Sequence, residues 1–147
     1  MENSFQRVGA TSNADIGKEF ETKVRDFFAT IGLSLRPAFP VQIGFSDKKP
    51  HKFDLGCENP PTLVECKSYT WTTGGNFPSA KIRSLNETML MFSVAPNHYR
   101  KILFLEKHSR RNVTLAKHYV DTQRHLVGPG VEIWEFDRDE DSGQQVL

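Results

Sequence analysis

Hydrophobic residues recur at helical spacing in three segments of the chain. Residues 14–31 carry apolar side chains three or four positions apart, which predicts an amphipathic helix with one buried stripe (Ile16, Phe20, Val24, Phe27, Phe28 and Ile31). Residues 80–94 show the same spacing, with Ser79 as the expected N-cap. A third helix is predicted over residues 113–126, before the break at Gly128-Pro129-Gly130.

Between these segments, short apolar or alternating runs predict strands. Pro37 and Pro40 place the first strand at a sheet edge, because proline cannot donate a ladder hydrogen bond. Asn59-Pro60-Pro61 forms the turn of an antiparallel hairpin between the second and third strands. The expected strands span residues 33–45, 52–57, 62–69, 101–106 and 131–136.

The order of these elements is helix, three strands, helix, strand, helix, strand. Strands interleaved with helices predict an α/β fold with a central mixed sheet flanked by helices. The 147 residues suit one domain. We expect a flexible arm over residues 1–13, a single domain over residues 14–137 and an acidic tail over residues 138–147.

Composition is that of an ordinary globular protein, with 37% hydrophobic and 25% charged residues. No apolar run approaches the roughly 20 residues that span a bilayer, and the start lacks the apolar core of a signal peptide. We therefore expect a soluble cytoplasmic protein. Two cysteines, Cys57 and Cys66, are too few for a disulfide scaffold and are expected to be buried thiols.

Charge is unevenly distributed although the net charge is only +1. Residues 97–125 hold seven Lys or Arg against two acids, whereas residues 132–147 hold six acids against one Arg. This asymmetry suits a phosphate-binding face with the acidic tail elsewhere. The alternative is a solvated helix face followed by a frayed terminus.

The sharpest chemical pattern is Asp54, then ten intervening residues, then Glu65-Cys66-Lys67. Alternate residues of a strand face the same way, so Glu65 and Lys67 share one face and Cys66 points to the other. The hairpin turn brings Asp54 beside them. The alternative is an edge strand that carries solvated charges.

Such a trio suits metal-assisted phosphodiester hydrolysis. Two neighbouring carboxylates favour a hard divalent cation such as Mg²⁺, which can activate water and polarise a phosphoryl oxygen. The lysine can orient the attacking water and stabilise transition-state charge. The backbone carbonyl of Cys66 is a plausible further ligand.

Asp54 and Glu65-Cys66-Lys67 resemble the two halves of the PD-(D/E)xK motif, with Phe53 where that motif has proline. The resemblance covers residues 14–107. It implies a restriction-endonuclease-like αβββαβ core, here with an added C-terminal helix and strand. It also implies a Mg²⁺-dependent deoxyribonuclease in which Mn²⁺ can substitute, with Asp54, Glu65 and Lys67 as catalytic residues.

A second match lies on the first helix. Gly17-Lys18-Glu19-Phe20-Glu21 is similar to the G-x-x-F-E start of resolvase-like and restriction-like members, where a helical glutamate reaches the metal. The resemblance implies that Glu21 is a further catalytic and metal-binding residue. Glu19 remains the competing choice.

The segment after Lys67 combines aromatic, amide and basic side chains on a glycine-hinged loop and the following helix. Such groups suit contacts to a nucleic-acid backbone or to bases. Asn86 and Glu87 could face the site, while His51 is expected at the surface. The predicted nucleic-acid-binding residues are Tyr69, Trp71, Asn76, Ser79, Lys81, Arg83, Arg110 and Arg111.

The function expected from these patterns is a metal-dependent endonuclease acting on DNA, of restriction, defence or repair type. The alternatives are a Holliday junction resolvase-like nuclease, an inactive nucleic-acid-binding module of the same fold, and a protein-interaction domain. We expect DNA as partner, a homodimer, no membrane association and no small-molecule cofactor. The target sequence, DNA against RNA, and duplex against branched substrate stay open.

Overall fold

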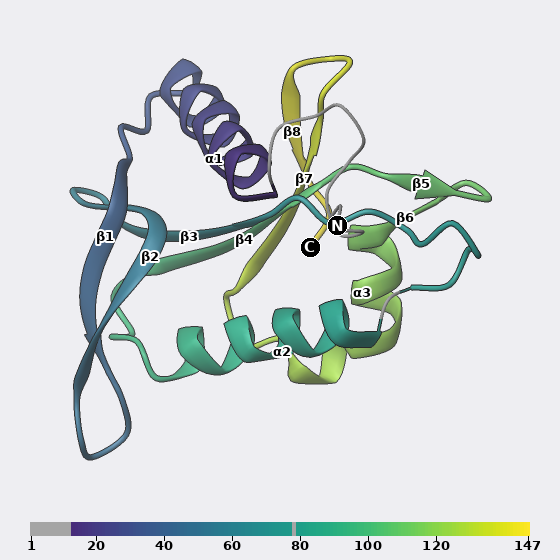
Figure 1. Ribbon diagram of the computed structural model, residues 1–147. Helices are drawn as coiled ribbons and strands as arrows, with labels where there is room; N and C mark the ends of the chain where they lie inside the picture. The colour runs from purple at the N-terminus through teal and green to yellow at the C-terminus, as the bar shows by residue number, and fades with distance from the viewer. Residues whose placement is uncertain (1–12, 78) are drawn as a thin grey trace, which may run out of the picture.

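The computed structural model describes residues 13–77 and 79–147. It is an α/β fold in which helices cover both faces of a six-stranded mixed sheet (Figure 1). In Figure 1 helix α1 lies above the sheet, and α2 and α3 lie below it. The elements are α1 Asn13–Thr30, β1 Arg36–Ile43, β2 Lys49–Glu58, β3 Pro61–Lys67, α2 Ser79–Ser93, β4 Arg100–Glu106, β5 Ser109–Arg110, β6 Val113–Thr114, α3 Leu115–Gln123, a 3-10 turn Arg124–Leu126, β7 Glu132–Asp137 and β8 Ser142–Gln145.

The sheet order is β1-β2-β3-β4-β7-β8. Strands β1, β2 and β3 form an antiparallel meander, and β8 is antiparallel to β7. Strands β3, β4 and β7 are parallel, because α2 and α3 carry the chain back between them. The predicted α/β class and mixed sheet are confirmed, as is the edge position of β1 with its two prolines.

Two hydrophobic cores lie on opposite faces of this sheet. The α1-side core packs Phe20, Val24 and Phe28 against Leu55, Val64, Cys66, Ile102, Phe104 and Phe136. The α2-side core packs α2 and α3 against Phe39, Phe53, Leu63, Leu103, Leu105 and Ile133. Cys57 and Cys66 are buried free thiols, as predicted.

Several predicted boundaries differ from the structure. Ile31 lies beyond the end of α1 and is 56% exposed, so it does not belong to the buried stripe. Residues 109–114 form a small β5–β6 hairpin, and the predicted third helix begins only at Leu115. Within the predicted acidic tail, β8 adds an edge strand whose Gly143 lies beneath the rings of Phe27 and Phe104. Apart from Asn13, the predicted N-terminal arm lies outside the described residues.

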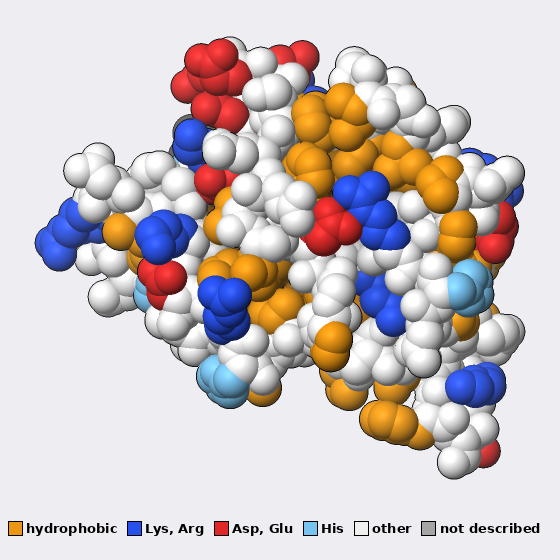
Figure 2. All heavy atoms as spheres, turned by 180° about the vertical axis from the view of Figure 1, so that it is seen from behind, with side chains coloured by type: hydrophobic (Ala, Val, Ile, Leu, Met, Phe, Trp, Pro, Cys, Tyr) orange, Lys and Arg blue, Asp and Glu red, His pale blue; other side chains and the backbone are white. Residues whose placement is uncertain are grey.

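The basic and acidic stretches are in contact where β4 pairs with β7, whereas the prediction placed the acidic tail elsewhere. They meet along neighbouring strands, because β4 begins the basic stretch and β7 begins the acidic one. Figure 2 shows Lys and Arg side chains scattered over that face, while acids gather at the top, over the β7–β8 turn. The cross-strand pairs are Arg100–Glu132 at 2.6 Å, Lys107–Asp137 at 3.5 Å, and Glu106–Arg138.

Within the described ranges, none of the helices has the length and apolar character needed to cross a membrane.

Candidate active site

Strand β2 leaves β3 at Asp54. The β2–β3 ladder starts at the pair Leu55 and Val64, whereas β2 pairs with β1 from Lys49 onward. Phe53 packs in the α2-side core and Leu55 in the α1-side core. Because residues two apart in a regular strand face the same side, this switch means that the strand rotates at Asp54. The aspartate therefore sits at the margin between the two faces.

Side chains replace the ladder hydrogen bonds at this point. The Cys66 N–H donates to Asp54 Oδ2 at 2.8 Å, and the Asp54 N–H donates to Glu65 Oε1 at 3.1 Å. Lys67 Nζ lies 4.0 Å from Glu65 Oε2. The structure thus brings Asp54, Glu65 and Lys67 together, and Asp54 touches both residues that precede the lysine.

Cys66 contributes its backbone to this site and its side chain to the α1-side core. Burial, followed by the charge of Asp54, raises the pKa of the Cys66 thiol well above its usual value. The thiol is therefore protonated and inert. In an extended strand the N–H and C=O of one residue point to the same edge, so the Cys66 carbonyl is directed toward the Asp54 side.

The structure separates the two glutamates of α1. Glu21 lies against Asp54, and burial together with the charge and hydrogen bonding of Asp54 raises the pKa of Glu21 to about 7. Glu19 is instead bound to Arg138, with Oε1 3.1 Å from Nη1. Of the two candidates, Glu21 is the one beside the trio.

Negative charge is concentrated where these elements meet. Glu65 is only 8% exposed, and burial followed by repulsion from Asp54 raises the pKa of Glu65 to about 8. Glu21 experiences the same repulsion from the α1 side. Lys18 lowers the pKa of Glu21 and Lys67 lowers the pKa of both glutamates, but neither lysine cancels the rise. We call Glu21, Asp54 and Glu65 the acidic cluster.

The oxygen atoms of the acidic cluster and of the Cys66 carbonyl suit a hard divalent cation, because Mg²⁺ prefers carboxylate and carbonyl oxygens as ligands. A cation between the three carboxylates would relieve the repulsion that raises two of their pKa values. In residues 13–77 and 79–147, no three His, Cys, Asp or Glu side chains already converge as a metal site. A cation held here would therefore have to draw the carboxylates inward.

A small cleft of about 120 Å³ opens beside Glu65 and Lys67, between β2, β3 and α2. Glu87 lines it, whereas Asn86 does not face the site. The Asn86 side chain accepts from Tyr119 Oη and donates to Gln123, toward α3. The sequence patterns do not indicate that Ser84 lines the cleft, and they predict His51 at the surface, although both residues line it. Neither residue belongs to a recognisable motif. The lining residues are His51, Glu65, Lys67, Ser84, Glu87, Thr88 and Met91.

Two predicted nucleic-acid-binding residues adjoin this cleft. The Tyr69 hydroxyl is 2.8 Å from Ser84 Oγ, and Lys81 Nζ lies 4.4 Å from the centre of the Tyr69 ring. This contact holds an ammonium group at the start of α2, on the same side as the cleft. Ser79 is the first residue of α2, and both Ser79 and Arg83 are exposed.

The other predicted contacts form a separate unit. Trp71 donates from its backbone N–H to His108 Nδ1 at 3.0 Å and from its indole N–H to the His108 carbonyl at 2.9 Å. The Arg110 guanidinium packs against Gly75, in the space that a Cβ there would fill. Loop residues 71–77 are thereby tied to the β5–β6 hairpin, with Asn76 and Arg111 exposed. These contacts join residues that are far apart in the sequence, so no local sequence pattern predicts them.

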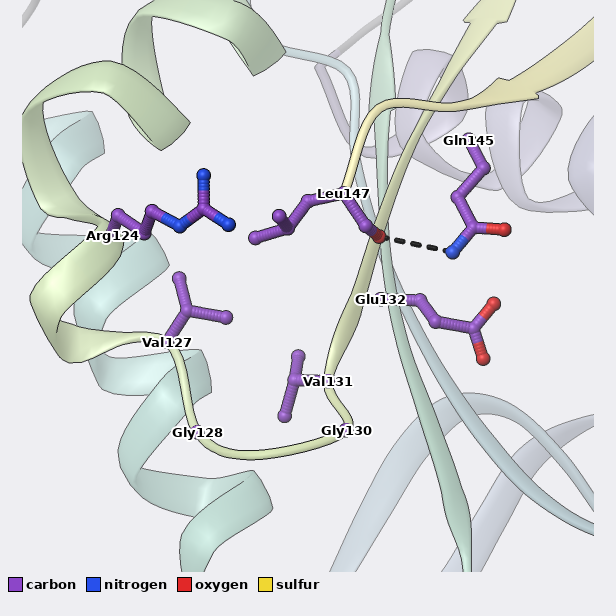
Figure 3. A pocket seen from close by; sticks show the side chains of 8 residues that line it. All are labelled: Arg124, Val127, Gly128, Gly130, Val131, Glu132, Gln145 and Leu147. Atoms are coloured by element: carbon purple, nitrogen blue, oxygen red, sulfur yellow. Dashed lines mark hydrogen bonds between the residues drawn. The ribbon is translucent and has the colours of Figure 1, made fainter.

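A hollow near the C-terminal residues offers no comparable chemistry (Figure 3). It has a volume of about 400 Å³ and lies where the chain enters β7, between Arg124 and Leu147. The acidic residue that lines this hollow, Glu132, is paired with Arg100. The hydrogen bond drawn as a dashed line in Figure 3 joins the Gln145 side-chain amide to the Leu147 carbonyl. The acidic cluster therefore remains the better candidate site.

Comparisons with protein-family models, with curated proteins and with solved structures give no match for this chain.

Proposed function

We propose that the protein is a Mg²⁺-dependent endonuclease that hydrolyses DNA phosphodiester bonds, of restriction, defence or repair type. The observation that carries the proposal is Asp54 at the end of the β2–β3 ladder, bonded to Cys66 N–H and flanked by Glu65 and Glu21. Three carboxylates and one lysine at the point where β2 separates from β3 suit phosphate-ester chemistry better than a surface role.

Each residue has a role that follows from its position. Asp54, Glu65, Glu21 and the Cys66 carbonyl would hold the cation, and the Cys66 N–H keeps the Asp54 carboxylate oriented. When bound, Mg²⁺ supplies polarisation of a phosphoryl oxygen and acidification of water. Lys67, 4.0 Å from Glu65, orients the attacking water and offsets negative charge on the transition state.

The order of elements supports the resemblance to PD-(D/E)xK nucleases. Helix α1, strands β1 to β3, helix α2 and strand β4 follow one another in the αβββαβ order that the resemblance implies, and α3, β7 and β8 come after them. The motif residues fall on β2 and β3, and the helical glutamate falls on α1. The choice of DNA, and of a homodimer for paired cutting, rests on that resemblance.

A plasmid-nicking assay tests the proposal. The wild-type protein should nick supercoiled DNA with Mg²⁺ and should be inactive in EDTA. Asp54→Asn and Lys67→Ala should each abolish nicking. Asp121→Asn and Lys117→Ala make the same chemical changes in an exposed pair on α3, 3.2 Å apart, and should keep full activity.

The same proteins separate the alternatives. Preferential cutting of a four-way junction over linear duplex would identify a resolvase-like enzyme. Binding without cleavage under Mg²⁺ and Mn²⁺ would contradict the enzyme and leave an inactive binding module. If Asp54→Asn still binds and cuts DNA, the acidic cluster is not the catalytic site. Sedimentation with and without DNA tests the expected homodimer.

A further inference from the structure

The β1–β2 hairpin extends beyond the sheet as an arm, which we define as residues 40–52. On the N-terminal side of Asp54, over residues 49–53, β2 pairs with β1 and not with β3. In Figure 1 the turn of this arm is the lowest point of the molecule, beyond the C-terminal end of α2. Any part of this arm in substrate binding rests on the proposed nuclease function.

The turn at the arm's tip has a defined conformation. The Gly44 N–H donates to the Val94 carbonyl at 3.1 Å, which fastens the turn to the end of α2. Lys48 Nζ donates to the Gly44 carbonyl at 2.7 Å. Gly44 has φ +141°, and a Cβ there would clash with the Asp47 carbonyl. Phe45, the next residue, is thus presented by a braced turn.

Phe45 points its ring into solvent. It is 80% exposed, the highest value among the exposed large hydrophobic residues of the described ranges. The inner side of β1 is already filled by Phe39, Val41 and Ile43 in the α2-side core. The fold therefore makes no use of the Phe45 ring.

The surroundings of Phe45 indicate the chemistry of its partner. Lys48, Lys49 and Lys52 are exposed on the arm, against the single acid Asp47. One flat apolar ring among cations suits a polyanion with flat apolar groups between its charges, which describes bases between phosphates. A stable protein interface would need about 800 Å² on each side, and Phe45 is followed by polar Ser46, Asp47 and Lys48.

The reach of the arm matches a bound duplex. Lys49 and Asp54 are five positions apart, which is about 17 Å at the rise of a β-strand. That is about half of the roughly 34 Å helical repeat of B-DNA. A duplex with its scissile phosphate at Asp54 would pass the tip half a turn away.

We propose that the arm tip is a DNA contact in which Phe45 inserts between stacked bases while Lys48 and Lys49 contact the neighbouring phosphates. Insertion of an apolar side chain unstacks a base step and bends the duplex. The arm then holds the duplex in a fixed register relative to the acidic cluster.

Fluorescence anisotropy with a 30-bp fluorescein-labelled duplex, in Ca²⁺ to prevent cleavage, measures the contact. Phe45→Ala should weaken binding about tenfold, and Phe45→Trp should restore it, because stacking on an aromatic ring is retained. Ile31→Ala, which removes another exposed apolar side chain, should leave affinity unchanged. Equal thermal unfolding of the variants would exclude a folding defect.

The same duplex with 2-aminopurine at successive positions reports insertion directly. The wild type should raise the fluorescence at one step, and Phe45→Ala should not. Lys48→Gln and Lys49→Gln should each reduce the salt dependence of binding by about one phosphate contact. If the wild type nicks plasmid but Phe45→Ala binds equally and unstacks equally, the arm contact is wrong and the nuclease stands. If the wild type neither binds nor nicks, both fail.

Discussion

Carboxylates occupy two regions of this sheet under opposite conditions. In the acidic cluster, burial and mutual repulsion raise the pKa of Glu21 to about 7 and that of Glu65 to about 8. Across β4 and β7, partial burial acts in the same direction but is outweighed. Hydrogen bonds from Arg100 and Trp134 lower the pKa of Glu132, and those from backbone N–H groups with Lys107 lower the pKa of Asp137.

The difference separates acids that stabilise the fold from acids that cost it stability. Each acid named on β4 and β7 has a cation within reach, so its charged form is favoured in the folded protein. The acidic cluster has Lys67, with Lys18 acting on Glu21, for three carboxylates. Carboxylates with perturbed pKa values cluster at functional sites, which agrees with the cation site that we propose.

Of the substitutions that test this contrast between unpaired and paired carboxylates, Glu65→Gln should have the largest effect. Loss of one cation ligand should lower the nicking rate by about 1,000-fold, in the upper range for removing one charge-stabilising group. The metal-free protein should become more stable at pH 8, because a buried charge is removed. Nicking kinetics and urea unfolding in EDTA measure the two effects. A variant that lost both activity and stability would show that Glu65 is a structural residue.

Arg138→Ala should have the largest effect on stability. Glu106 is 9% exposed and would lose its partner, and Glu19 would be released as well. Leaving one buried charge unpaired costs about 3 kcal/mol. Urea unfolding tests this, with Arg83→Ala as an exposed control. A loss below about 1 kcal/mol would mean that Glu106 becomes protonated or hydrated instead.

The pH dependence of stability should differ in sign between the two regions. Folding raises the pKa values of Glu21 and Glu65, so the folded state binds more protons between about pH 4.5 and 8. Their contribution is complete below pH 4.5 and is lost as pH rises through 7 and 8. Glu132 and Asp137 contribute above their usual pKa values and lose stability as pH falls.

Unfolding in EDTA across pH 4 to 8.5 should therefore show a decline from about pH 4.5 to about pH 8. Glu21→Gln combined with Glu65→Gln should flatten that decline, and Glu132→Gln should not. Saturating Mg²⁺ should reverse it, since the cation binds the ionised carboxylates. An unchanged profile in the double variant would assign the decline to other groups.

The smallest effect is expected at the Arg100–Glu132 pair. Arg100 is 42% exposed, so the pair is screened by solvent although its two bonds are 2.6 and 2.9 Å long. Glu132→Gln should cost about 0.5 kcal/mol, and the loss should shrink in 1 M salt. A loss above about 2 kcal/mol, unaffected by salt, would place this pair among the buried ones.

Local patterns predicted the order of elements well. The stripe on α1, the prolines of β1 and the apolar run of β4 each record which surface is buried, so periodicity reveals them. The hairpin around Asn59-Pro60-Pro61 was predicted from turn residues, and it is the hairpin that brings Asp54 beside Glu65. The proximity of Asp54, Glu65 and Lys67 could therefore be predicted from their spacing around this hairpin.

The remainder depends on contacts between distant segments. Glu19 and Glu21 are both polar residues beside Phe20, and only the position of Arg138 and Asp54 around α1 distinguishes them. The rotation of β2 at Asp54 follows from packing of Phe53 and Leu55 in opposite cores. Strand β8 has the sequence Ser-Gly-Gln-Gln, which carries no apolar alternation at all.

Gly143 shows how such a polar strand can still be fixed. The Phe27 ring approaches within 2.9 Å of where a Cβ would stand, and Phe104 is closer still. The position of this edge strand is thus fixed by the absence of a side chain at Gly143, which lets the Phe27 and Phe104 rings pack against the backbone. Among randomised codons at this site, we expect survivors of a folding selection to encode glycine alone, although the neighbouring glutamines tolerate most replacements.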